Sequence, residues 1–204
     1  MLHVLITVKP STRYPGKNAR LAGYTLAWLA WELLHEAEPV QVWTVGARAE
    51  LPELLPPAWR HIECATGSHR GDIEHAEAVI CPAAGDVLVL AQLTQPLRRR
   101  GLLHEVAACS REHGCAVTAC QGRQDDWRTL GEGGRWQPQK GQRVLLHDGA
   151  LYGWLPGKVG AIFTPGAEHG VVINYAGQPV DVDEAADIPP DLPGGFMRLL
   201  LNQQ

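Results

Sequence analysis

The sequence contains no long apolar run. None of its apolar segments approaches the roughly 20 residues needed to cross a bilayer. The apolar part of the first ten residues, MLHVLITVKP, is too short for a secretory signal. Its five cysteines include no CxxC pair, and four of them lie in apolar or helical surroundings. We therefore expect free thiols and a cytoplasmic protein.

The sequence also lacks an excess of positive charge. Its 204 residues carry a formal net charge of -4, which argues against a general affinity for nucleic acid or anionic membranes. Basic residues do gather locally, at positions 9–20 and 97–100. We therefore expect neither nucleic acid nor membrane as a partner, while small anions can still bind.

Several catalytic motifs are absent from the sequence. It has neither a GxxxxGK(S/T) phosphate loop nor a GxGxxG dinucleotide turn. Its nine histidines show no HExxH or paired ligand spacing, so scattered surface or helix histidines are the default. No serine lies in a nucleophile elbow. His147 is an exception among the histidines, because it directly precedes Asp148.

The order of apolar patterns predicts an α/β fold. The first half alternates short β-branched or apolar runs with amphipathic stretches of helical spacing, and the second half is mostly strand-like. The predicted strands are 3–8, 40–45, 86–91, 115–120, 144–154, 159–163 and 171–175, and the predicted helices are 24–37, 72–80 and 101–113. Such alternation implies right-handed βαβ units, and so a mostly parallel sheet with helices on both faces. We expect one domain over residues 1–204, with a mobile or dimerisation arm over residues 123–146.

A basic loop follows the first predicted strand. Residues 9–18 read KPSTRYPGKN and contain three cations and a glycine. In a parallel sheet, ligands bind beyond the carboxyl ends of the strands. Backbone N–H groups and cations at this position suit a triphosphate. From these residues alone, a solvated basic surface loop is an equally good interpretation.

Two further segments carry polar side chains where a ligand could meet them. Gln92 and Thr94 follow the central strand, which would fix their positions, although a strand end before a proline turn is also common. Asp181 and Asp183 are separated by one apolar residue, so in an extended segment they point the same way. Two such carboxylates attract a hard divalent cation such as Mg²⁺. Alternatively, Asp183 only caps a helix that starts at Glu184.

Four segments together resemble the acylneuraminate cytidylyltransferase family, with the Kdo cytidylyltransferases as a second relative. Residues 11–18, STRYPGKN, resemble the family's SKR-hydrophobic-PGKN loop, and residues 90–98, LAQLTQPLR, are similar to its LLQPTSPLR. Residues 148–152, DGALY, resemble NGAIY, and residues 180–187, VDVDEAAD, resemble DIDTPEDL. The four matches occur in the family's order over most of the chain. The resemblance implies a Rossmann-like nucleotidyltransferase fold related to glycosyltransferase A.

The resemblance also implies a reaction and a set of roles. A hydroxyl of an acidic sugar would attack the α-phosphate of CTP and release pyrophosphate, with Mg²⁺ as cofactor. The implied partners are CTP, a small acidic acceptor and a second copy of the chain in a homodimer. The implied catalytic residues are Lys17, Asp181 and Asp183, of which the two aspartates hold the metal. The implied nucleotide ligands are Lys9, Ser11, Arg13, Gly16, Lys17, Asn18 and Arg70, and the implied acceptor ligands are Gln92, Thr94, Arg143 and Asp148.

The sequence departs from the family pattern at several points. Lys9 stands where the family has arginine, and Lys cannot make the bidentate grip of Arg. Pro10 removes a backbone donor. Asp148 replaces the usual asparagine, and the arm is shortened. These changes leave open a different small acid, such as a phosphonate, a different nucleotide, such as UTP, or a catalytically silent nucleotide- or sugar-binding protein.

Overall fold

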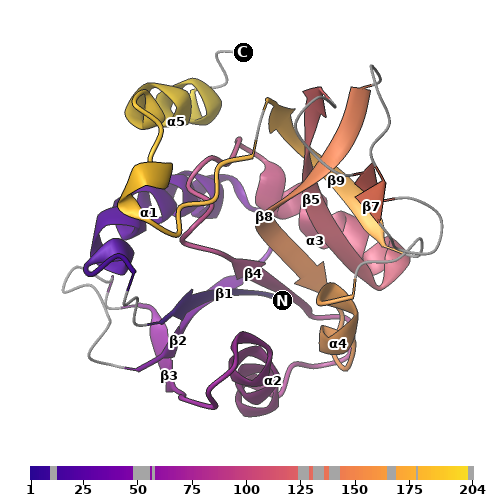
Figure 1. The fold of residues 1–204 in the computed structure, drawn as a ribbon. Helices are drawn as coiled ribbons and strands as arrows, with labels where there is room; N and C mark the ends of the chain where they lie inside the picture. The colour runs from indigo at the N-terminus through magenta and orange to yellow at the C-terminus, as the bar shows by residue number, and fades with distance from the viewer. Residues whose placement is uncertain are drawn as a thin grey trace.

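The computed structural model describes residues 1–9, 13–47, 56, 58–123, 129–130, 136–137, 143–164, 169–177 and 179–201 (Figure 1). Its strands are β1 (Leu2–Val8), β2 (Val40–Gly46), β3 (Arg60–Glu63), β4 (Val87–Ala91), β5 (Cys115–Arg123), β6 (Thr129–Leu130), β7 (Trp136–Gln137), β8 (Arg143–Trp154) and β9 (Gly170–Ala176). Its helices are α1 (Lys17–His35), α2 (His69–Ile80), α3 (Leu102–His113), α4 (Val159–Ile162), the 3-10 helix η3 (Ala185–Asp187) and α5 (Leu192–Leu200).

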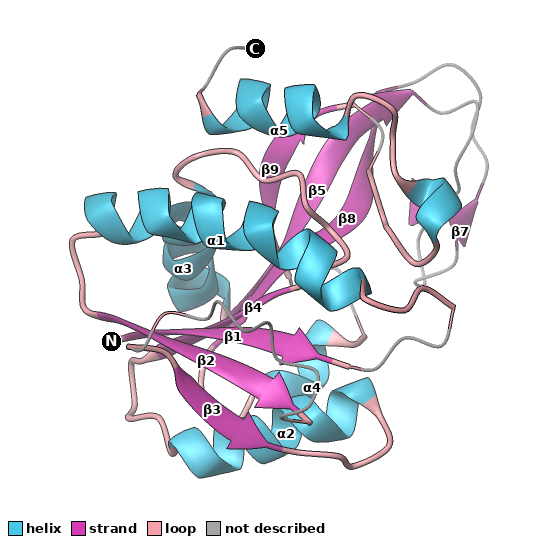
Figure 2. Cartoon of the chain, turned by 90° about the vertical axis from the view of Figure 1, so that its left-hand side faces the viewer, coloured by secondary structure: helices cyan, strands magenta, loops and turns pink. Residues whose placement is uncertain are grey.

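Seven strands form one sheet in the order β3-β2-β1-β4-β8-β5-β9. β8 runs antiparallel to both of its neighbours, β4 and β5. The other pairings within this sheet are parallel, so its remaining six strands point the same way. Helices α1, α3 and α5 lie on one side of the sheet, and α2 and α4 lie on the other (Figure 2). The mostly parallel sheet covered on both faces confirms the predicted fold class.

Both faces of the sheet are buried, which explains why the central strand β4 is apolar throughout and β1 is mostly apolar. In β1, Leu2, Val4 and Ile6 pack into the cluster beneath α1 and α3. Leu5, between them, packs into the opposite cluster with residues of α2 and α4. All five residues of β4 are buried. The period-two alternation of a strand therefore supplies two cores from one segment.

Several predicted boundaries differ from the structure. Helix α1 begins at Lys17 rather than at residue 24, because Gly16 adopts a left-handed φ of 76° and the chain enters the helix directly after it. Helix α2 begins at His69, and its cap is Ser68, whose side chain accepts from the Gly71 N–H at 2.9 Å. Asp72, predicted to be the cap, lies one turn inside.

The strand predicted over residues 159–163 is wrong, because this segment is the short helix α4. Short apolar runs do not distinguish a strand from a buried helical turn. Here the segment packs Val159, Ala161 and Ile162 onto the cluster beside α2. Strand β3 and helix α5 were not anticipated either, since both follow proline-containing segments with weak periodicity.

The predicted arm over residues 123–146 falls largely outside the described residues. Within it, β6 and β7 form a separate antiparallel pair, and β8 begins at Arg143. Among the helices in the described ranges, none combines the length and apolar character needed to span a bilayer. All five cysteines are free, as expected, and three of them are buried.

Candidate active site

The carboxyl ends of the parallel strands bring two of the predicted segments to one rim. β1 and β4 are parallel neighbours, so the loop after Val8 and the segment after Ala91 leave the sheet at the same edge. β2 ends beside them, where Gly46 pairs with Val8. A Cβ at Gly46 would collide with the carbonyl group of Val8, so glycine permits this close approach.

The basic loop and the aspartate segment meet across this rim. Lys17 Nζ lies 3.4 Å from Asp183 Oδ1, although the two residues are 166 positions apart. The Lys17 side chain is only 12% exposed, whereas that of Asp183 is 55% exposed. Lys17 is the first residue of α1, so the helix start fixes its position.

Thr94 connects the segment after β4 to the aspartates that face Lys17. The backbone N–H of Val182 donates to the Thr94 carbonyl at 2.8 Å, and Val182 is fully buried between the two aspartates. The Thr94 side chain hydrogen-bonds to the Asp181 carboxylate. Desolvation raises the pKa of Asp181, with Asp183 and Asp187 adding to the effect and Thr94 and Lys17 opposing it. Asp181 is therefore a half-buried carboxylate that has two other carboxylates near it.

Asp183 does not cap a helix. The residue at the N-cap of η3 is Glu184, which forms a capping box with Asp187. Asp187 Oδ2 accepts from the backbone N–H groups of Asp183 at 3.0 Å and of Glu184 at 2.6 Å. The Asp183 carboxylate consequently stays exposed and faces Lys17, which excludes the capping interpretation.

The donor set of this site fits a hard divalent cation. Mg²⁺ takes oxygen ligands and usually binds proteins through one or two carboxylates, leaving its other positions to water and phosphate. Asp181 and Asp183 could supply two such carboxylates. Across the described ranges, no group of three or more His, Cys, Asp or Glu side chains could hold a metal. The ammonium of Lys17, set against Asp183, is itself a cation in this position.

Lys9 and Asn18 are also brought together, but Lys9 has a partner in the chain. Asn18 Nδ2 donates to the Lys9 carbonyl at 2.7 Å, so the amide holds the loop rather than facing solvent. Lys9 Nζ lies 2.8 Å from Asp72 Oδ2. Burial alone would raise the pKa of Asp72, but hydrogen bonds from Lys9, Thr66 and Cys64 outweigh it and lower the pKa to about 2. Asp72 was not predicted as part of the site.

The remaining predicted nucleotide ligands are Arg13, Ser11 and Arg70, and none of them has a described contact with Lys17 or Asp183. Arg13 is exposed, and it forms no ion pair with a described residue. Ser11 lies outside the described residues. Arg70 does not face Lys17: its Nε donates to Glu74 Oε1 at 2.7 Å, and its guanidinium lies over the Phe163 ring at 6.0 Å. Arg70 is thus an exposed helix arginine that packs towards α4.

The predicted acceptor residues divide into two groups. The Gln92 side chain hydrogen-bonds to Tyr152, whose pKa is raised to about 12 mainly by burial. A Cβ at Gly149 would lie 3.3 Å from the Tyr152 hydroxyl and 3.5 Å from Gln92 Nε2, so neutral polar groups gather around this glycine. Tyr152 is the aromatic end of the DGALY segment. The side chain of Arg143 is not among those described.

Asp148, in contrast, faces the interior and is not placed to contact an acceptor. Its side chain is 3% exposed, and both oxygens accept hydrogen bonds from the chain. The donors are Thr118 Oγ1, Ala150 N, Cys120 Sγ and Asn174 Nδ2. Its charge also favours the ionised form of fully buried Arg98. The aspartate therefore stabilises the core where the family's pattern has asparagine.

Arg98 is a second residue whose role sequence reasoning missed. It is fully buried and donates to the carbonyls of Ala150 and Gln92 and to Thr25 Oγ1. Its guanidinium also lies over the Trp28 ring at 5.1 Å. Arg98 thereby ties the segment after β4 to α1 and β8. An arginine directly after Pro96 and Leu97 was the available signal.

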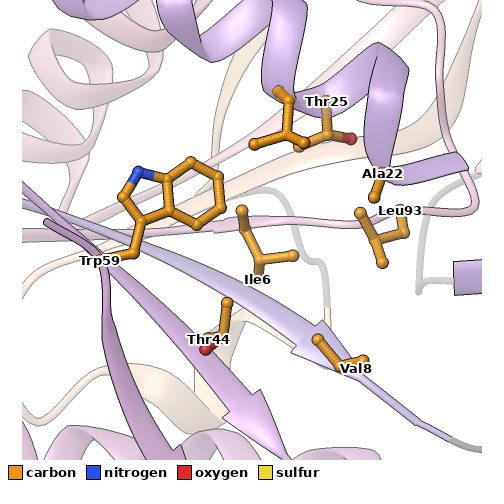
Figure 3. A pocket seen from close by; sticks show the side chains of 8 residues that line it. Ile6, Val8, Ala22, Thr25, Thr44, Trp59 and Leu93 are labelled. Carbon is orange, nitrogen blue, oxygen red and sulfur yellow. The ribbon is translucent and has the colours of Figure 1, made fainter. Parts of the chain in front are cut away.

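A hollow beneath α1 adjoins the rim (Figure 3). Ile6 and Val8 of β1, Thr25 of α1 and Trp59 lie around it, and its lining contains no charged residue. Without a cation it does not suit a triphosphate. The charged groups instead lie where α1 begins and where residues 181–183 pass.

No protein-family model and no curated protein matches the chain. Several solved structures do match the chain. A CMP:2-keto-3-deoxy-manno-octonic acid synthetase in complex with CTP is 14% identical, with 91% of this chain and 94% of that chain covered and a TM-score of 0.59. The inositol-1-phosphate CTP transferase from T. maritima is 10% identical, with 97% and 95% covered and a TM-score of 0.59.

A third similar structure is Rv0371c from Mycobacterium tuberculosis in complex with manganese. It is 15% identical, with 98% of this chain and 97% of that chain covered and a TM-score of 0.55. At these identities the likeness concerns the fold alone. The chain thus shares, over nearly its whole length, the single-domain α/β fold of these solved proteins.

Proposed function

We propose that this chain is a CTP-dependent cytidylyltransferase that attaches CMP to a small acidic acceptor and releases pyrophosphate. The observation that carries the proposal is the contact between Lys17 and Asp183. It joins a cation of the loop after β1 to a carboxylate near the carboxyl terminus. The four-segment resemblance and the fold shared with two CTP-using enzymes support the same activity.

In this reaction a hydroxyl oxygen of the acceptor bonds to the α-phosphorus of CTP. The bond from that phosphorus to the bridging oxygen of the β-phosphate breaks, pyrophosphate leaves, and the hydroxyl proton is lost. The protein takes little part in covalent chemistry, so it acts mainly by positioning the two substrates and neutralising charge. Lys17 and Arg13 would neutralise the triphosphate, and Gly16 would leave its loop without a side chain to obstruct it.

In the proposed triphosphate site, Lys9 would be held in place by contacts within the chain. Its ammonium has three donors, of which Asp72 takes one. The Asn18 hydrogen bond holds its backbone. Lys9 can therefore meet a phosphate oxygen from a fixed position, without first losing the rotamer freedom of a free lysine. This arrangement compensates in part for the missing arginine.

Asp181 and Asp183 would hold Mg²⁺. When bound, the ion neutralises charge on the phosphate oxygens. The two carboxylates would hold the ion beside Lys17, because Thr94 and buried Val182 fix the segment that carries them.

The described residues beside Gly149 indicate which groups of an acceptor could be recognised. Asp148 is buried, and the described groups beside Gly149 are neutral: the Gln92 amide and the Tyr152 hydroxyl. Such groups recognise hydroxyls. An acidic sugar of the nonulosonic or Kdo type is the first candidate, and a phosphonate or another small polyol acid is the second.

Pyrophosphate release tests the proposal. It is measured with CTP, UTP, ATP and GTP, with and without Mg²⁺, against nonulosonic acids, Kdo and small phosphonates. We expect release only when CTP, Mg²⁺ and one acidic acceptor are present together. CTP binding without release for any acceptor would favour a catalytically silent binding protein. Release with another nucleotide in preference to CTP would overturn the cytidylyl assignment.

A further inference from the structure

We infer that Lys17 and the divalent cation compete for the same carboxylates, so that metal binding at Asp181 and Asp183 frees Lys17 for the triphosphate. The inference rests on the proposed function, because it concerns the proposed metal site. It assigns Lys17 a second role beyond phosphate binding. It also predicts that removing this lysine tightens the binding of metal alone, which is the opposite of its effect on CTP.

The first argument is the position of the ammonium. Lys17 Nζ lies 3.4 Å from Asp183 Oδ1 and also exerts a favourable electrostatic effect on Asp181. Its field therefore reaches both carboxylates of the pair. A divalent cation on these oxygens would sit within a few ångströms of a positive charge, and the two would repel strongly.

The second argument is that this contact can break easily. The Lys17 side chain is 12% exposed but Asp183 is 55% exposed, and an ion pair of 3.4 Å to a solvated carboxylate contributes little to stability. Because Lys17 is the first residue of α1, its backbone position does not depend on the contact with Asp183. The side chain can therefore turn from the carboxylate to a phosphate oxygen while α1 stays in place.

The pair formed by Lys9 and Asp72 shows what a fixed contact looks like. Its distance is 2.8 Å, and the Asp72 side chain is only 4% exposed. Thr66 and Cys64 also donate to that carboxylate. The Lys9 side chain is 37% exposed, but removing its ammonium would leave the buried Asp72 carboxylate without its charged partner, which is costly. Of the two lysines that follow β1, only Lys17 is thus held by an exchangeable partner.

The consequence is a coupling between metal and nucleotide. Without a bound metal ion, the Lys17 ammonium stays beside the aspartates and is less available to a phosphate oxygen. Once a metal satisfies the aspartates, Lys17 turns to the triphosphate that arrives with the metal. The two ligands should therefore bind with positive coupling in the unmodified protein, and the coupling should weaken when Lys17 loses its charge.

The test uses Mn²⁺ alone as the probe, because it prefers the same oxygen ligands and its free form is detected by electron paramagnetic resonance. Mn²⁺ is titrated into the full chain and into Lys17→Met without nucleotide. A unit charge next to a divalent ion at the surface changes its affinity by about tenfold. We expect Lys17→Met to bind Mn²⁺ about tenfold more tightly, while its Kd for CTP rises at least about fivefold.

Arg20→Met is the matched control. Arg20 lies one turn further along α1, is exposed, and forms no ion pair with any described residue. The variant removes the same charge without removing a competitor, so its Mn²⁺ affinity should change by less than about twofold. Methionine is a good helix former at both positions, and thermal unfolding checks that both variants fold. Asp183→Asn should weaken Mn²⁺ binding and so locate the site.

The outcomes separate the two proposals. If the unmodified chain binds Mn²⁺ and Asp183→Asn weakens it, but Lys17→Met binds no more tightly than Arg20→Met, the competition is refuted and the proposed function stands. If neither the unmodified chain nor Lys17→Met binds Mn²⁺ at millimolar concentration, the metal assignment fails and the competition fails with it.

Discussion

Replacing Asp148 by asparagine changes one oxygen of a buried carboxylate into an NH₂ group. In the structure Oδ1 accepts from Thr118 Oγ1 and from the Ala150 N–H, and Oδ2 accepts from Cys120 Sγ at 3.1 Å and from Asn174 Nδ2 at 2.8 Å. An asparagine must place its NH₂ group against one of these two pairs of donors. The substitution therefore sets a donor against a donor in a buried site.

The neighbouring amide cannot relieve this conflict. Asn174 Oδ1 accepts from the Arg99 N–H at 3.1 Å, and Asn174 Nδ2 also donates to the Leu97 carbonyl at 2.8 Å. Turning the Asn174 amide over would break both of these hydrogen bonds. In the other orientation, the new NH₂ group would face the Ala150 N–H, which cannot rotate.

The magnitude follows from these contacts. A hydrogen bond to a charged group contributes about 1.5–3 kcal/mol, and Arg98 also loses the charge that favours its ionised form. We expect Asp148→Asn to lower the free energy of unfolding by about 2–4 kcal/mol. For a chain of this size that corresponds to a fall in Tm of about 5–15 °C.

Urea and thermal unfolding measure the effect. Asp191→Asn is the matched control, because Asp191 forms an exposed pair with Arg198 and should change the free energy by less than about 0.5 kcal/mol. At temperatures where Asp148→Asn is folded, its KM for CTP should be unchanged. A loss of stability no larger than that of the control would refute the structural role of Asp148.

Three further predictions concern catalysis and pH. Asp181→Ala and Asp183→Ala should each lower the rate of pyrophosphate release by at least about a hundredfold, as loss of a metal ligand should; near-normal rates in both would remove the metal assignment. Lys17→Ala should raise the KM for CTP, and an unchanged KM would separate the loop from the nucleotide. Burial raises the pKa of Glu32, which accepts from two backbone N–H groups at the start of α3, to about 7 from an ordinary value of 4.5. Since a raised pKa in the folded state stabilises at low pH, the wild type should lose about 3 kcal/mol relative to Glu32→Gln as pH rises from 4.5 to 7; parallel stability–pH curves for the two proteins would contradict this.

Much of the fold could be predicted because burial on two faces leaves a strong pattern. The runs that became β1 and β4 are apolar in nearly every position, and the helices between strands show helical spacing. The direction of β8 could not be read, since a strand has the same side-chain period whichever way it runs. Segment 159–163 was assigned to the wrong class because a short run of four apolar residues and a glycine suits either structure.

The candidate site could be predicted where its residues belong to segments that stand out in the sequence: the basic loop after β1, the segment after β4 and the aspartate segment. Lys17, Thr94 and Asp183 come together as expected because strand ends and a helix start determine their positions. Asp72 was missed since its importance comes from a contact with Lys9, 63 positions earlier in the sequence. Asp148 was misassigned because an alternating pattern cannot show which side of a bulged strand faces the core.

The most direct test of the central claim is a crystal structure of the chain grown with CTP and Mn²⁺, with the metal located by its anomalous scattering. The account predicts an anomalous peak on the carboxylates of Asp181 and Asp183, with the triphosphate of CTP beside it and Lys17 turned from Asp183 to a phosphate oxygen. A CTP molecule bound away from the start of α1, or a metal peak that touches neither aspartate, would contradict it.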